Sequence, residues 1–192
     1  CNDRQAHLRL FYVLRASGWD VPVHLLDMPR TDSAHARRFA RAQYRSLVAF
    51  CAGITGTPPS AGALVAAAEG ERRLGAALAR LRACRRSTEA GPSGSRSLDA
   101  LLASSREAPD EAVAVVEAAS SSADPRVGAI RLHLTGSAHP DATIYAELEA
   151  TGFVVVSEDH DTGDGAWLGA AADGDDVDAV AEALLAQHFD RT

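Results

Sequence analysis

Apolar side chains recur every three or four positions along roughly the first two thirds of the chain, which is the spacing of amphipathic helices. Serines stand before several of these stretches, where a hydroxyl accepts hydrogen bonds from the first N–H groups of a helix. Ser33 and Ser60 are two such caps, and Gly18 ends the first stretch. The pattern predicts helices over residues 3–17, 33–53, 60–86, 98–105 and 109–119. The intervening residues 87–97, rich in Ser, Gly and Pro, are predicted to form an exposed loop.

Shorter apolar runs predict three strands. Residues 21–26 and residues 126–134 each predict a strand, and the second is followed by a turn and a helix over residues 140–150. Residues 153–156 are continuously apolar, which is typical of a parallel strand covered on both faces, and a last helix is predicted over residues 177–187. Strand, helix, strand and helix in this order form the unit of a doubly wound sheet.

These elements divide the chain into three segments. Residues 1–30 resemble the end of an N-terminal α/β domain, residues 31–122 are helical, and residues 123–192 form a C-terminal α/β domain. Because the chain starts at Cys1 and its only methionine is Met28, we expect it to be an internal piece of a longer protein, with both α/β domains cut short. The predicted fold class is therefore α/β, a fragment of two Rossmann- or flavodoxin-like parallel-sheet domains separated by a helical segment.

Composition and charge exclude some classes of partner. The net charge of −7 argues against binding to duplex nucleic acid, which requires positive charge. No apolar run approaches the roughly 20 residues that cross a bilayer, so no membrane-spanning helix is predicted. The three cysteines lie far apart in the sequence, which does not indicate a disulfide framework and favours the reducing cytoplasm.

The turn Thr135-Gly136-Ser137 is the first candidate site. It follows a predicted strand and precedes a helix, so its hydroxyl and N–H groups suit an anion or a phosphate-bearing ligand. In the alternative interpretation Gly136 makes the turn and Ser137 or His139 caps the helix. The residues by themselves favour this structural role.

The acidic loop over residues 158–165 is the second candidate site. It directly follows the predicted strand 153–156, and its carboxylates and imidazole, among them Asp159, His160 and Asp161, suit a metal ion or proton transfer. The alternative is a solvated loop whose side chains bond their own backbone. Both interpretations stay open, since loops at the ends of such strands are often functional.

The cysteines give a third candidate. Cys1 precedes a predicted helix whose N-terminus favours a thiolate, although it is also consistent with a free cysteine. Cys51 and Cys84 lie within helical patterns and are interpreted as structural. No Cys-x-x-Cys pair occurs, so local spacing alone holds no metal cluster.

The order of the segments resembles the 2-hydroxyacyl-CoA dehydratase family, which includes the 2-hydroxyglutaryl-CoA dehydratase D-component and subunits of benzoyl-CoA reductase. The resemblance covers nearly the whole chain. Its weaker stretches are Cys1-Asn2-Asp3, Pro29-Arg30 with Ser33, and Thr55-Gly56 before the helix from Ser60. Its most specific stretches are Arg131-Leu132-x-Leu134-Thr135-Gly136-Ser137 and Val154-Val155-Val156-Ser157-Glu158-Asp159-His160-Asp161-Thr162-Gly163.

The resemblance implies two α/β domains that jointly hold an iron–sulfur cluster of the [4Fe-4S] type, with Cys1 as one ligand. Many members have Asp-x-Cys-Thr-Gly where this chain has Asp159-His160-Asp161-Thr162-Gly163. Asp161 is then either an unusual ligand or the mark of a subunit without a cluster, since these clusters normally use thiolates. The aspartate-containing loop also resembles that of benzoyl-CoA-reductase-type subunits.

The implied reaction is the radical elimination of water from a 2-hydroxyacyl-CoA through a ketyl radical anion. The implied partners are the acyl-CoA substrate, a second homologous subunit and an ATP-dependent iron–sulfur activator that supplies the electron. Thr135, Gly136 and Ser137 are implied contacts to the thioester or coenzyme A, and His160 is a candidate proton donor. The alternatives are reduction of an aromatic acyl-CoA, a non-catalytic partner subunit, or a generic α/β binding module without iron. We expect the 192-residue chain alone to be inactive.

Overall fold

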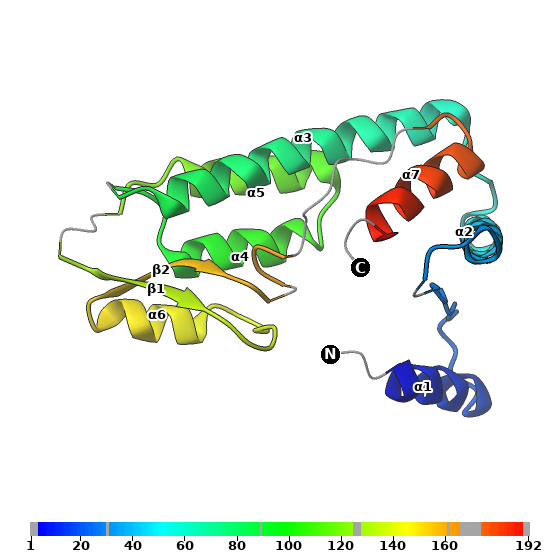
Figure 1. Ribbon diagram of the computed structural model, residues 1–192, viewed down its shortest axis with the longest axis horizontal. Helices are drawn as coiled ribbons and strands as arrows, with labels where there is room; N and C mark the ends of the chain where they lie inside the picture. Colours follow the sequence, from blue (N-terminus) through cyan, green and yellow to red (C-terminus); the bar gives the residue numbers. More distant parts are fainter. Residues whose placement is uncertain are drawn as a thin grey trace. The chain divides into compact units, whose positions relative to one another are not determined.

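The computed structural model describes residues 4–29, 31–88, 90–124, 128–160, 162–165 and 174–189 (Figure 1). Its contacts define two compact units. The first unit comprises residues 1–68 and 172–192, and the second comprises residues 69–171. No helix within the described part of the chain is both long and apolar enough to cross a membrane.

The first unit is helical. It contains α1 (Arg4–Ala16), α2 (Ala34–Thr55), the start of α3 (Ala61–Arg86) and α7 (Val177–Phe189). The predicted serine caps are confirmed, because Ser33 Oγ accepts from Ala36 N at 3.1 Å and Ser60 Oγ accepts from Ala63 N at 3.2 Å. Arginines spaced four residues apart on α2 pair with carboxylates of α7, as in Arg41 with Glu182 at 2.9 Å.

The strand predicted over residues 21–26 is wrong. Residues 19–29 form neither helix nor strand, and Val21 is 57% exposed where a buried side chain was expected. A strand needs a hydrogen-bonded neighbour, and the described residues supply none here. The segment packs through side chains instead, with the His24 ring stacked on Phe50 at a centroid distance of 5.0 Å.

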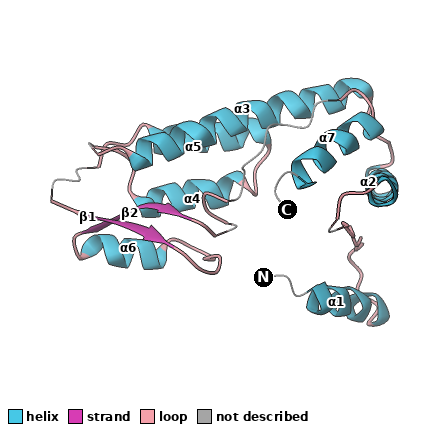
Figure 2. Cartoon of the chain, viewed as in Figure 1, coloured by secondary structure: helices cyan, strands magenta, loops and turns pink. Residues whose placement is uncertain are grey.

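The second unit contains most of α3, three further helices and a small sheet (Figure 2). The helices α3, α4 (Gly94–Ser104) and α5 (Pro109–Ser120) share one apolar core. Its members are small or branched side chains that lie on the inner stripes of the helices, namely Leu74, Ala77, Leu78, Leu81, Ala100, Leu101, Ala112, Val116 and Ala119. The predicted helices therefore exist, and α5 matches its predicted range to within one residue.

The sheet has two parallel strands, β1 (Ile130–Leu134) and β2 (Phe153–Glu158), joined through α6 (Thr143–Ala150). The predicted strand–helix–strand unit is thus present, and the fold is of the α/β class. Leu132 pairs with Val155 and His133 pairs with Ser157, so the pairing skips Val156. A second core forms from Val155 together with side chains of α4, of α6 and of the residue before α6, namely Leu98, Leu102, Tyr145 and Ala142. The division into two Rossmann-like domains stays a prediction.

Helix α4 begins at Gly94, four residues before the predicted start at Leu98. The Ser- and Gly-rich composition indicated a loop here, but Ser93 caps the helix, with its Oγ accepting from Arg96 N at 3.2 Å, and a residue that is distant in sequence satisfies further N–H groups. The carboxylate of Glu149 accepts from Gly94 N at 2.5 Å and from the Ser95 hydroxyl at 2.6 Å. A carboxylate at a helix N-terminus stabilises the helix through both hydrogen bonds and the helix dipole.

Gly94 is predicted to tolerate no side chain. A Cβ at this position would lie 2.5 Å from the carbonyl oxygen of Val155, within the backbone of β2. Gly94→Ala is expected to lower the free energy of unfolding by about 1–3 kcal/mol, since the strand must move to relieve the overlap. Gly53→Ala is the matched control, because Gly53 lies in α2 with no atom within 4 Å of its Cβ position and should gain about 0.5–1 kcal/mol. Urea unfolding of both variants compares these values, and an unchanged midpoint for Gly94→Ala would contradict the prediction.

Candidate functional site

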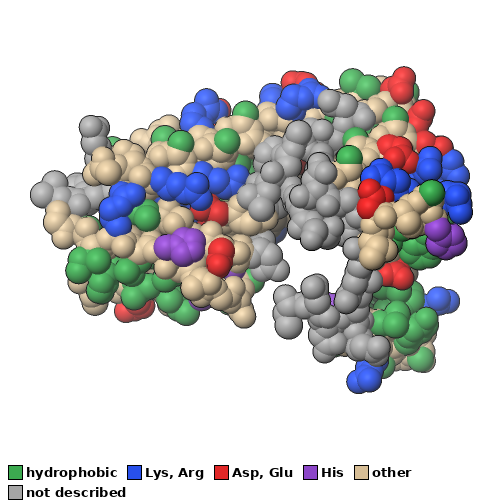
Figure 3. Space-filling model, viewed as in Figure 1, with side chains coloured by type: hydrophobic (Ala, Val, Ile, Leu, Met, Phe, Trp, Pro, Cys, Tyr) green, Lys and Arg blue, Asp and Glu red, His purple; other side chains and the backbone are tan. Residues whose placement is uncertain are grey.

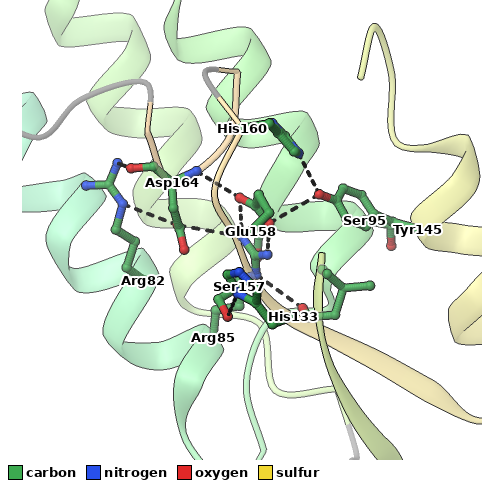
Figure 4. A network of polar contacts seen from close by, with 12 residues as sticks. Arg82, Arg85, Ser95, His133, Tyr145, Ser157, Glu158, His160 and Asp164 are labelled. Carbon is green, nitrogen blue, oxygen red and sulfur yellow. Dashed lines mark hydrogen bonds and ion pairs between the residues drawn. The ribbon is translucent and has the colours of Figure 1, made fainter. Parts of the chain in front are cut away.

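A buried ion pair between Arg85 and Glu158 joins α3 to β2 in the second unit (Figure 4). Arg85 is on the last turn of α3 and Glu158 ends β2, and their side chains are 1% and 0% exposed. The guanidinium donates Nη1 to Glu158 Oε1 at 2.9 Å, donates Nη2 to Oε2, and donates Nε to the carbonyl of Val155 at 3.2 Å. This bidentate geometry fixes the end of β2 against α3.

The remaining contacts of Glu158 come from the loop that follows it. Asp164 N donates to Glu158 Oε1 at 2.9 Å. Gly163 lies so close that a Cβ there would overlap with the Glu158 carboxyl group. Burial works to raise the pKa of Glu158, but the hydrogen bond and charge of Arg85 outweigh it, so the pKa lies below its usual value. Glu158 is therefore a carboxylate at neutral pH, around which the loop folds back.

Tyr145 of α6 connects this ion pair to His160. Its hydroxyl donates to Glu158 Oε2 at 3.2 Å and lies 2.8 Å from His160 Nε2. Burial raises the pKa of Tyr145, as does the nearby Glu158 charge, so the phenol keeps its proton. On the other side of the imidazole, Nδ1 lies 3.2 Å from the Thr162 hydroxyl, which donates to the carbonyl of His139 at 3.4 Å. A continuous line of hydrogen bonds thus runs from Glu158 through Tyr145 and His160 to Thr162.

Asp164 joins the same loop to two further arginines of α3. Its carboxylate accepts from Arg86 Nη2 at 2.7 Å and from Arg82 Nε at 3.3 Å, and its backbone carbonyl accepts from Arg82 Nη2 at 2.8 Å. The Asp164 side chain is only 7% exposed, so these contacts lie largely away from water. The loop is therefore fastened to α3 at both Glu158 and Asp164.

The turn Thr135-Gly136-Ser137 follows β1 and is exposed. Its donors already hold a carboxylate, because Asp159 accepts from the Thr135 hydroxyl at 2.9 Å and from Gly136 N at 3.3 Å. The hydrogen bond from Thr135 lowers the pKa of Asp159. The structure thus brings the two predicted sites together at the carboxyl ends of the two strands, with Asp159 as the link between them.

The other predicted site residues have different positions. His160 belongs to the network but is only 3% exposed, with the half-buried His139 ring edge-on at a centroid distance of 5.1 Å. Cys1 and Asp161 lie outside the described residues. Cys51 on α2 is exposed and Cys84 on α3 is half-buried, and neither forms a disulfide. Within the described ranges, no group of three or more His, Cys, Asp or Glu residues is placed to hold a metal ion.

Arg85 and Tyr145 are the site residues that sequence reasoning missed. Both reach Glu158 from other elements, so no local motif contains them. One signal was available for Arg85, which continues the apolar stripe of Leu74, Leu78 and Leu81 at helical spacing. A charged residue on such a stripe requires a buried partner of opposite charge.

The site is thus a polar loop at the carboxyl end of a parallel strand, and the buried ion pair of Arg85 with Glu158 anchors it to α3. This is the position where α/β proteins place residues that act on ligands, and it defines the class as an α/β protein with a strand-end site.

A comparison with protein families shows which family the chain belongs to. The chain belongs to the 2-hydroxyglutaryl-CoA dehydratase, D-component family, whose model matches residues 5–192. The resemblance seen in the sequence is confirmed, and the family is one of dehydratase-type enzyme components. No curated protein matches the chain.

Proposed function

We propose that this chain belongs to a 2-hydroxyacyl-CoA dehydratase-type lyase, which eliminates water from a 2-hydroxyacyl-CoA. The family match over residues 5–192 is the observation that carries the proposal. The enzyme would work with a second homologous subunit and with an ATP-dependent activator that delivers electrons. The substrate class follows from the family.

The described residues do not fit an iron–sulfur cluster. Such clusters use several thiolates, whereas Cys51 and Cys84 belong to different units and neither is part of a possible ligand group. Cys1 and Asp161 are the remaining candidates in this chain, and together they offer one soft and one hard ligand. The described residues bear instead on how the protein binds the substrate and holds protons.

The strand-end residues suit these two tasks. Thr135 and Ser137 lie on an exposed turn and are proposed to contact the thioester end of the substrate. Because Asp159 holds the Thr135 hydroxyl and Gly136 N, this turn suits a neutral group better than an anion. His160 is proposed to hold a proton for the reaction, with Tyr145 fixing its ring orientation through Nε2.

The test uses the native polypeptide, purified without oxygen together with its partner subunit. Iron and acid-labile sulfide are measured in the wild type, in Cys1→Ser and in Asp161→Cys. We expect formation of an enoyl-CoA from a 2-hydroxyacyl-CoA when activator, ATP and reductant are present, and iron that falls in Cys1→Ser would identify Cys1 as a cluster ligand. Absence of this product with every 2-hydroxyacyl-CoA supplied would contradict the proposal.

Asp161 favours a second candidate. An aspartate in this loop resembles benzoyl-CoA-reductase-type subunits and also suits a non-catalytic subunit that supports a cluster-bearing partner. Reduction of an aromatic acyl-CoA in the same assay would support the reductase. Iron that appears only in Asp161→Cys would support the non-catalytic subunit.

A further inference from the structure

Positive charge gathers where the carboxyl end of α3 meets the sheet. Two carboxylates, Glu158 and Asp164, form ion pairs with three arginines of α3, which are Arg82, Arg85 and Arg86. The Arg86 side chain nevertheless stays 54% exposed. These five groups by themselves carry one positive charge in excess, although the whole chain has a net charge of −7.

Arg131 of β1 adds a fourth guanidinium to this end of α3. It is exposed, and it donates Nη2 to the carbonyl of Arg86 and Nη1 to the carbonyl of Ser87, both at 2.7 Å. Among the described residues, the structure gives Arg131 no carboxylate partner. Its position is therefore fixed by backbone while its charge remains uncompensated.

His133 extends the same surface along β1. Leu132 and Leu134 are half-buried, whereas Arg131 and His133 are exposed, because alternate residues of a strand point to opposite faces. Two positions along a strand span about 6.5 Å, so the two side chains are neighbours on one face. His133 Nδ1 lies 2.8 Å from the Ser157 hydroxyl of β2. Figure 3 shows a band of basic side chains across the second unit, with a histidine and acidic side chains close to it.

We propose that Arg86, Arg131 and His133, with Ser157, bind a phosphate group of coenzyme A. Guanidinium groups match phosphate oxygens in pairs, and imidazole and hydroxyl groups add further donors. The neighbouring turn at Thr135 does not compete for the anion, because Asp159 already occupies its donors. The inference rests on the proposed function only in naming coenzyme A as the source of the phosphate.

The test measures the affinity of adenosine 3′,5′-bisphosphate for the native polypeptide with its partner subunit. This compound carries the 3′-phosphate of coenzyme A and one phosphate of its 5′-diphosphate, without the thioester. In Arg86→Gln/Arg131→Gln the Kd is expected to rise about tenfold or more, the size of one lost charge-assisted contact. The matched control Arg72→Gln/Arg80→Gln removes the same charge from exposed arginines of α3 that pair with Glu69 and Glu117, and it should leave the Kd unchanged. Arg131→Lys, which keeps the charge, should recover part of the affinity.

Several outcomes would overturn the inference. An unchanged Kd in the folded double variant would do so, as would equal losses in the control pair. Inorganic phosphate that competes as strongly as adenosine 3′,5′-bisphosphate would reject coenzyme A as the source. If Arg131→Gln does not fold, Arg86→Gln/His133→Gln replaces it, because that variant keeps the hydrogen bonds of Arg131 to α3.

Turnover separates this inference from the proposed function. An unchanged KM for the acyl-CoA in a fully active double variant would reject the phosphate surface and leave the lyase in place. Binding of adenosine 3′,5′-bisphosphate that depends on Arg86 and Arg131, without any elimination of water by the wild type, would reject the lyase and support the surface.

Discussion

Arg85→Met is expected to lower the free energy of unfolding by about 3–5 kcal/mol, because it leaves a buried carboxylate without its partner. Arg85 and Glu158 are both almost completely buried, so water cannot replace the lost contact. Asp164 loses only its 3.7 Å contact with Arg85 and keeps Arg82 and Arg86. Urea unfolding followed by circular dichroism measures the difference from the wild type.

Two variants control this result. Arg85→Met/Glu158→Leu removes both charges and should recover a large part of the stability, since a buried ion pair is often replaceable by apolar side chains. Arg80→Met breaks the exposed pair of Arg80 with Glu117 on the same helix and should cost less than about 1 kcal/mol. A loss in Arg80→Met as large as that in Arg85→Met would contradict the role assigned to burial.

The second large effect is expected for Glu158→Gln, and it depends on pH. At neutral pH this variant should be less stable than the wild type by about 1.5–3 kcal/mol, since the charged hydrogen bonds to Arg85 are lost. The folded pKa of Glu158 lies below its ordinary value of 4.5, because Arg85 outweighs the opposing effect of burial. The contribution of this carboxylate is therefore complete above about pH 4.5 and is lost as the pH falls through the lowered pKa.

The difference in unfolding free energy between wild type and Glu158→Gln should thus be constant from neutral pH to about 4.5 and shrink below it. Unfolding curves at a series of pH values test this course. Glu117→Gln, which alters an exposed carboxylate, should show little difference from the wild type at any of them. A difference for Glu158→Gln that grows on acidification would show that the pKa is raised.

Local signals account for the parts of the fold that the sequence predicts well. Ser33 and Ser60 cap the helices that they were expected to cap, and the apolar run at residues 153–156 is a parallel strand. The run at residues 21–26 has the same appearance, but a short apolar run does not reveal whether a neighbouring strand exists. The start of α4 was missed although Ser93 caps it locally, because the Ser- and Gly-rich composition indicated a loop and the second acceptor, Glu149, lies 55 residues away from Gly94.

The site follows the same rule: its local parts were predicted from the sequence, and the parts that depend on residues distant in the sequence were missed. The loop over residues 158–165 was found because its residues are consecutive, and it lies at a strand end as expected. Its burial was not foreseen, since an acidic sequence usually indicates a solvated loop. That burial depends on Arg85 and Tyr145, whose contacts to Glu158 span 73 and 13 residues.

Val156, the residue that the sheet pairing skips, determines which face of the sheet each of the last residues of β2 occupies. In a regular strand Ser157 would share the face of Val155, and Glu158 would share the face of Val154. Because the pairing passes over Val156, Ser157 instead meets the exposed His133, and Glu158 turns inward to Tyr145. Val156 therefore works as a one-residue spacer between an apolar and a polar half-strand. A single deletion there would remove the bulge and leave a regular strand, in which Ser157 still lies opposite His133 and Glu158 still lies opposite Leu134.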